Sequence, residues 1–282
     1  AHTTSSLAYA GSYLQDLYRY FTLRMSKEEE GNPFLMMSDL LFIDSPIIAP
    51  RIKRPEAKAV REYAYAHRLY RHALKIIENL TEKQEKSVGK ECLRKAFCYA
   101  MLKDTTSAVE TFRLCEENGV EISEELQAVY ASCLMSIGQP TEAIRVYKQL
   151  FGHEGTTISL YSYAVALSQT NQYAEACDIL YQEDYLRPNQ TKVVRLLAWC
   201  SLKANISDPL QLYHRLRTMQ PLRSIDWLNA GHAALAAGAK SEAMNYYRQS
   251  ALQTFTADDR TLLASLGVPQ QTISLVEDAL QI

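Results

Sequence analysis

Histidine and cysteine are the residue types here that most often act as bases, nucleophiles or metal ligands, and the chain has six of each. His67 and His72 lie five positions apart in a helical pattern, whereas two metal ligands on one helix usually lie three or four apart. His153, His214 and His232 are isolated in the sequence, so we interpret each as a helical residue rather than a base.

The cysteines form no Cys-x-x-Cys pair and no grouping with histidine. We interpret them as small buried apolar residues, which favours a reducing compartment. They are Cys92, Cys98, Cys115, Cys133, Cys177 and Cys200.

Motifs of the common enzyme classes are absent from the sequence. It contains no glycine-rich phosphate loop, no Gly-x-Ser-x-Gly elbow and no His-Glu-x-x-His metal helix. Acidic residues such as Glu116 and Glu117 are abundant, as is ordinary for solvated helix faces. We therefore expect no enzyme, no cofactor and no metal, while an enzyme whose residues assemble only in three dimensions stays an alternative.

A small residue recurs at intervals of 33 to 35 positions, which is typical of stacked helical repeats. These anchors are Ala73, Ala108, Ala143, Ala176, Leu210 (in place of alanine) and Ala243. A second small residue precedes each of the last five anchors by twelve positions; these are Ala96, Ala131, Ala164, Ala198 and Gly231. Twelve residues separate the middles of two short helices joined by a tight turn, so the pattern predicts close helix crossings. Turns are predicted at Gly138, Asn171, Asn205 and Gly238.

This pattern resembles the tetratricopeptide repeat (TPR) family. The clearest copy runs from Trp227 to Ala251, with Gly231, Gly238 and Ala243 at family positions, and a second copy runs from Leu160 to Pro188. The resemblance implies an all-α, right-handed α-solenoid of about five helix hairpins with irregular capping helices at both ends. The capping segments and the expected long N-terminal helix favour a bacterial TPR protein.

The expected organisation has three parts. Residues 1–87 form an irregular N-terminal helical cap and first repeat, residues 88–255 the TPR-like repeats, and residues 256–282 the C-terminal capping helices. In the first part we expect a helix from Leu7 to Met25 and a long helix from Pro55 to Leu80. In the last part, Gly267 to Pro269 should separate two closing helices.

In a TPR array the first helix of each hairpin lines a concave groove, where function normally resides. The resemblance therefore implies a protein-interaction scaffold that binds a peptide, a helix or a partner subunit without chemistry. Counting from each mid-helix small residue gives the candidate groove residues Arg94, Phe97, Val129, Ser132, Tyr161, Val165, Arg195, Trp199, Leu228 and His232. Arg195 and Trp199 are the first candidates, because Arg and Trp often anchor interfaces.

The groove does not resemble the carboxylate clamp of TPR domains that grip chaperone tails. That clamp needs Lys, Asn and Arg on three adjacent first helices, whereas Val129, Ser132, Tyr161 and Val165 occupy the middle of this surface. We therefore do not expect a chaperone tail as the ligand.

A basic segment gives an alternative function. Between Arg51 and Lys75, eight cations stand against Glu56 and Glu62, an excess of six that could attract nucleic acid or another anionic surface. The formal net charge of −2 and the pI near 6.4 argue against a dedicated nucleic-acid-binding protein.

No apolar run is long enough for a membrane span. The chain begins with Ala1 rather than Met, so we expect a trimmed or processed start. We expect a cytoplasmic location and another protein or peptide as the partner. The oligomeric state is left open.

Overall fold

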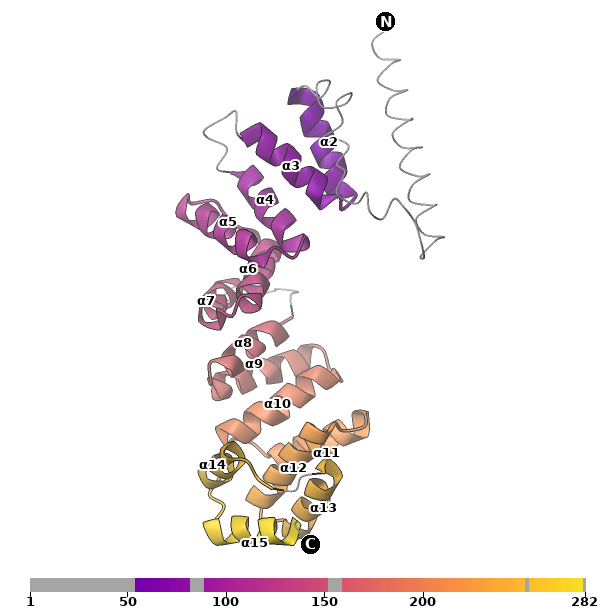
Figure 1. Ribbon diagram of the computed structural model, residues 1–282, viewed down its shortest axis with the longest axis vertical. Helices are drawn as coiled ribbons and strands as arrows, with labels where there is room; N and C mark the ends of the chain where they lie inside the picture. The colour runs from indigo at the N-terminus through magenta and orange to yellow at the C-terminus, as the bar shows by residue number, and fades with distance from the viewer. Residues whose placement is uncertain (1–53, 82–88, 152–158, 252–253, 281–282) are drawn as a thin grey trace, which may run out of the picture. The chain divides into compact units, whose positions relative to one another are not determined.

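Figure 1 shows the computed structural model of the chain, which describes residues 54–81, 89–151, 159–251 and 254–280. In these ranges the chain consists of α-helices joined by turns, without a β-strand, as the repeat pattern predicts. The helix expected from Leu7 to Met25 lies outside the described residues. Contacts within the chain divide it into two units, Ala1–Ser87 and Val88–Ile282, and each is described by itself.

The first unit contains the helices α2 (Arg54–Ala66) and α3 (Tyr70–Thr81) in contact with each other. The expected single helix from Pro55 to Leu80 is therefore wrong. The backbone turns at Arg68, whose φ is 59°, and the amide of Leu69 donates to the carbonyl of Ala64 at 2.8 Å, which closes α2. The apolar spacing continues across this turn because each helix buries one face, so periodicity alone did not reveal the break.

The second unit contains hairpins of two helices each. First helices, in chain order, are α4 (Lys90–Met101), α6 (Glu124–Ser136), α8 (Tyr161–Gln169), α10 (Thr191–Ala204) and α12 (Ser224–Ala236). Their second helices are α5 (Thr105–Glu117), α7 (Pro140–Phe151), α9 (Tyr173–Leu186), α11 (Pro209–Met219) and α13 (Lys240–Ser250). Every first helix contacts its own second helix, and every second helix up to α11 contacts the next first helix, so the hairpins stack in chain order.

The recurring small residues lie where these helices cross. The five residues that precede the anchors lie on first helices, the last five anchors lie on second helices, and all of them are buried. At Gly231 the approach leaves no room for a side chain, because a Cβ built there would lie 2.6 Å from Cδ1 of Tyr247 on α13. Small residues recur twelve positions apart because the two helices of a hairpin approach too closely at their crossing for larger side chains.

The predicted turns are confirmed by the backbone. Gly138 and Gly238 have φ of 75° and 78°, and Asn171 and Asn205 have φ of 60° and 52°. These are the two residue types that adopt the left-handed conformation at least cost, so they end one helix and permit the reversal into the next. Asp208 also caps α11, because its carboxylate accepts a hydrogen bond from the amide of Gln211.

Two apolar clusters form the core of the second unit, one built from α4 to α10 and the other from α10 to α15. Helix α10 contributes to both: Val193 and Leu197 face the first cluster, and Val194 and Ala198 face the second. Trp199 packs against both. This helix therefore belongs to the cores of both halves of the repeat array.

Two closing helices follow the last hairpin, α14 (Ala257–Ser265) and α15 (Gln270–Leu280). The predicted break between them is confirmed, with φ of 80° at Gly267. Leu263, Ile273 and Val276 are buried in the second cluster. The closing helices thus cover apolar surface that the last hairpin would otherwise expose, as repeat arrays require at their ends.

Candidate functional site

First helices contact each other in three of the four neighbouring pairs of hairpins, α4 with α6, α8 with α10 and α10 with α12. We call the exposed surface of α4, α6, α8, α10 and α12 the first-helix face. Nine of the ten candidate groove residues keep part of their side chain exposed on these helices; they are Arg94, Phe97, Val129, Ser132, Tyr161, Val165, Arg195, Trp199 and Leu228.

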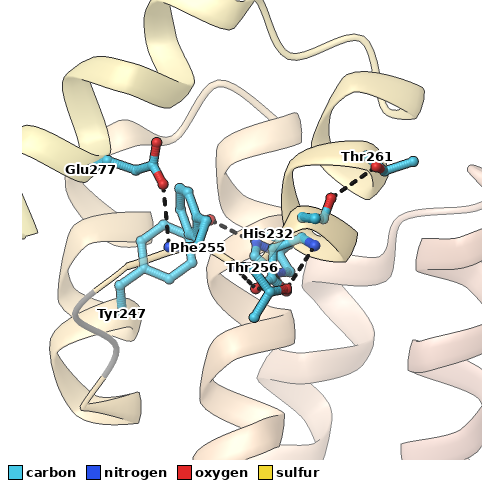
Figure 2. Close-up of polar contacts among 8 residues, drawn as sticks. His232, Tyr247, Phe255, Thr256, Thr261 and Glu277 are labelled. Carbon is cyan, nitrogen blue, oxygen red and sulfur yellow. Dashed lines mark hydrogen bonds and ion pairs between the residues drawn. The ribbon is translucent and has the colours of Figure 1, made fainter.

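His232 differs from this expectation because it is fully buried. Figure 2 shows why: Phe255 and the start of α14 lie over it. Its Nε2 lies 3.1 Å from Oδ1 of Asp259 and its Nδ1 lies 3.0 Å from the hydroxyl of Tyr247. Since a carboxylate only accepts, Nε2 carries the hydrogen of the bond to Asp259. His232 therefore joins the last hairpin to the closing helices and does not reach the surface.

Hydrogen bonding makes Asp259 strongly acidic. The hydrogen bond from His232, together with those from the hydroxyl and amide of Thr256, lowers the pKa of Asp259 to about 2. Thr256 and Asp259 also form the capping box that begins α14. One carboxylate thus fixes the closing helix by its cap and by a bond to the buried ring.

Arg195 is held in a pair with a buried carboxylate. Its Nε lies 3.0 Å from each oxygen of Asp226 on α12, and the two side chains are 19% and 3% exposed. Asp226 also accepts the amide of Arg223 at 3.1 Å, which caps α12. Because its guanidinium pairs with Asp226, the main role of Arg195 is to connect α10 with α12 of the next hairpin rather than to contact a ligand.

Two lysines of α10 lie over aromatic rings on α8, on α10 and at the start of α9. Nζ of Lys192 lies 4.8 Å from the centroid of the Tyr161 ring. Nζ of Lys203 lies 5.2 Å from the Trp199 ring and 5.7 Å from the ring of Tyr173, the first residue of α9. We call Tyr161, Tyr173, Lys192, Trp199 and Lys203 the lysine–aromatic patch.

Lys203 was not among the residues predicted from the sequence. A signal for it was present, since Lys203 follows Trp199 by four positions, and residues four apart share a helix face. Tyr173 begins a second helix, so counting from first-helix positions did not include it.

A hollow of about 550 Å³ opens beside α5, α6 and α7. Glu116 and Tyr130 line it, but Arg145 of α7 donates to both carboxylate oxygens of Glu116. Burial and the neighbouring carboxylate raise the pKa of Tyr130 to about 12, so its hydroxyl stays protonated. This arrangement offers an ion pair and a neutral phenol rather than an activated acid or base.

The described ranges contain no group of three or more His, Cys, Asp or Glu side chains placed to hold a metal ion. All six cysteines are buried and unbridged. Burial raises the pKa of Cys98 to about 12, which keeps that thiol protonated.

One of the eight cations of the basic segment does not reach the surface. Arg61 is buried and its guanidinium pairs with Glu62 at 2.8 Å, so it adds no charge to the surface. Residues 51–53 of that segment lie outside the described ranges. None of the helices in those ranges is both long and apolar enough to cross a membrane.

No protein-family model matches the sequence, and no curated protein matches it either. Among solved structures, the C-terminal part of a TPR repeat-containing protein from Cytophaga hutchinsonii matches with a TM-score of 0.51 and 15% identity, over 79% of this chain and 94% of that one. This chain has the TPR fold.

Other TPR structures are similar at lower scores. YrrB, described as a TPR protein with an unusual peptide-binding site, has a TM-score of 0.49 and 10% identity, over 72% of this chain and 97% of that one. A tetratricopeptide repeat protein from Parabacteroides merdae has a TM-score of 0.44 and 13% identity, over 98% of this chain and 97% of that one.

Proposed function

We propose that the chain is a non-catalytic interaction scaffold that binds a peptide, a helix or a segment of a partner protein along the first-helix face. What supports the proposal is one observation: nine candidate side chains of apolar, aromatic, polar and cationic type stay partly exposed on the first helices of successive hairpins. Preformed surfaces of this kind bind extended ligands with little ordering cost.

Within the face, Trp199 and Tyr161 are the apolar anchors of the proposal. Each ring packs against the core and is partly exposed, and a lysine ammonium lies over each of them. A fixed aromatic ring loses little entropy on binding, which is why such residues dominate interfaces. Arg195 contributes by fixing α10 against α12, since its guanidinium already pairs with Asp226.

A selection from random peptides tests the proposal and does not require an identified ligand. Peptides of about twelve residues, which span about 40 Å when extended and so exceed the length of any first helix, are selected on the full chain. The selected peptides are then measured against Val165→Trp, which places a large ring on the first-helix face. The matched control is Leu114→Trp on the second helix α5, where Leu114 is 50% exposed.

The proposal expects the selected peptides to bind Val165→Trp about tenfold more weakly or worse, and to bind Leu114→Trp like the parent chain. Circular dichroism of both variants checks that each remains folded. Equal affinity for the parent and Val165→Trp, or loss of binding in Leu114→Trp alone, would place binding elsewhere on the chain.

A further inference from the structure

Helix α10 carries three cations and no carboxylate along its fourteen residues. The charge of Arg195 is balanced by Asp226. In the part of the chain that the structure describes, neither Lys192 nor Lys203 has a carboxylate within ion-pair distance. The lysine–aromatic patch therefore carries two positive charges that form no ion pair with a described acid.

On the neighbouring helix α9, Glu183 and Asp184 are already paired with Arg187 and Arg215, and Asp178 forms no ion pair with either lysine. Helix α8 contains no acidic residue. Glu175, near the start of α9, is already bonded to the hydroxyl of Tyr163 at 3.0 Å and to Lys148 at 3.2 Å. Removing the two ammonium groups would break no ion pair among the described residues; what they contribute to the fold is their contact with the rings of Tyr161, Tyr173 and Trp199.

The aromatic rings hold both ammonium groups in place. A lysine ammonium is attracted by the face of an aromatic ring, which reduces its motion without using its three N–H donors on a carboxylate. An incoming carboxylate can therefore pair with each ammonium without breaking an ion pair, while the rings of Tyr161 and Trp199 contact its apolar part.

The spacing of the two lysines sets the distance between the two ligand groups that would pair with them. Lys192 and Lys203 are eleven positions apart on α10, which is about 16 Å along a helix axis at 1.5 Å per residue. An extended peptide covers that distance in about five residues at roughly 3.3 Å each. The side chains between the two ends would lie over Tyr161, Val165 and Trp199.

We propose that the lysine–aromatic patch recognises an extended acidic peptide with two carboxylates about five residues apart, one at Lys192 and one at Lys203, and an apolar side chain between them. The inference rests on the proposed function, because it assigns a ligand class to the same first-helix face. A nucleic acid fits less well, since a backbone of phosphates needs a longer row of cations than two.

The test uses a synthetic peptide of about twelve residues with two Glu about five positions apart around a Leu, and the same peptide with Gln at both positions. Binding to the full chain is measured by fluorescence anisotropy. The variant K192Q/K203Q removes both charges of the patch. The matched control K103Q/K240Q removes two charges from exposed lysines at hairpin turns.

We expect the Glu peptide to bind the parent chain and the control variant about tenfold more tightly than it binds K192Q/K203Q. We also expect the parent chain to bind the Glu peptide about tenfold more tightly than the Gln peptide. Added salt should reduce both differences in affinity, because it screens the charges. Equal binding of the Glu and Gln peptides, or an equal loss in the control, overturns the acidic ligand. So does a preference for a single-stranded oligonucleotide that K192Q/K203Q abolishes.

The two proposals fail in different ways. If Val165→Trp weakens selected peptides that carry no acidic residues, the first-helix face binds peptides and the acidic ligand is wrong. If Val165→Trp changes nothing, the face itself is not the binding site and both proposals fall.

Discussion

Replacing Arg195 by Ala should destabilise the second unit more than an exposed substitution would. The change removes the guanidinium from the carboxylate of Asp226, which is 3% exposed and keeps the hydrogen bond from the amide of Arg223. Breaking a buried pair by removing one partner costs about 3–5 kcal/mol. Because Arg195 itself keeps 19% exposure and water can enter in its place, we expect a loss near 3 kcal/mol in the free energy of unfolding.

A double-mutant cycle separates the pair from the packing of the arginine stem. Asp226→Asn removes the charge but keeps an oxygen that can accept the amide of Arg223, so we expect it to cost about 1–2 kcal/mol. The double variant R195A/D226N should lose less than the sum of the two single variants, with a coupling energy of about 1–3 kcal/mol.

The assay is urea unfolding followed by tryptophan fluorescence. Both tryptophans of the chain, Trp199 and Trp227, lie on α10 and α12, the two helices that the pair joins. Their signal therefore reports the region that the substitution affects. A loss below about 0.5 kcal/mol for Arg195→Ala, or additive losses in the double variant, would refute a stabilising role of the pair.

Two further predictions concern the last hairpin and its closing helices. Gly231→Ala should lower the free energy of unfolding by about 1–2 kcal/mol, because overpacking against the Tyr247 ring outweighs the gain in helix propensity; a higher urea midpoint would contradict this. Asp259→Asn should destabilise the chain at neutral pH. The folded-state pKa of Asp259 is lowered to about 2 by the bond from His232, so its contribution exists above the unfolded pKa near 4 and is lost as pH falls toward 2. The difference between parent and variant should therefore shrink over that range in pH-dependent melts, and a constant difference would show that the charge is not the cause.

The architecture of the repeats was readable from the sequence because its determinants are local. Small residues twelve positions apart mark a crossing within one hairpin, and Gly138 and Asn171 mark turns between adjacent helices. Each signal depends on residues within one repeat, and the repeat is then copied along the chain. The break at Arg68 was missed because neither Gly nor Pro marks it and the apolar spacing runs through it.

The roles of individual candidate residues depended on partners in other repeats. His232 occupies the same repeat position as Trp199 and Val165, yet it is buried because α14 covers the last first helix and brings Asp259 to the ring. Arg195 pairs with Asp226, thirty-one positions away, so its charge is balanced between helices. The sequence determined which helices form and where they cross, because short-range sterics and turn geometry set both. Only the tertiary structure decided which side chains stay open to a ligand, because that depends on what the next hairpin places against them.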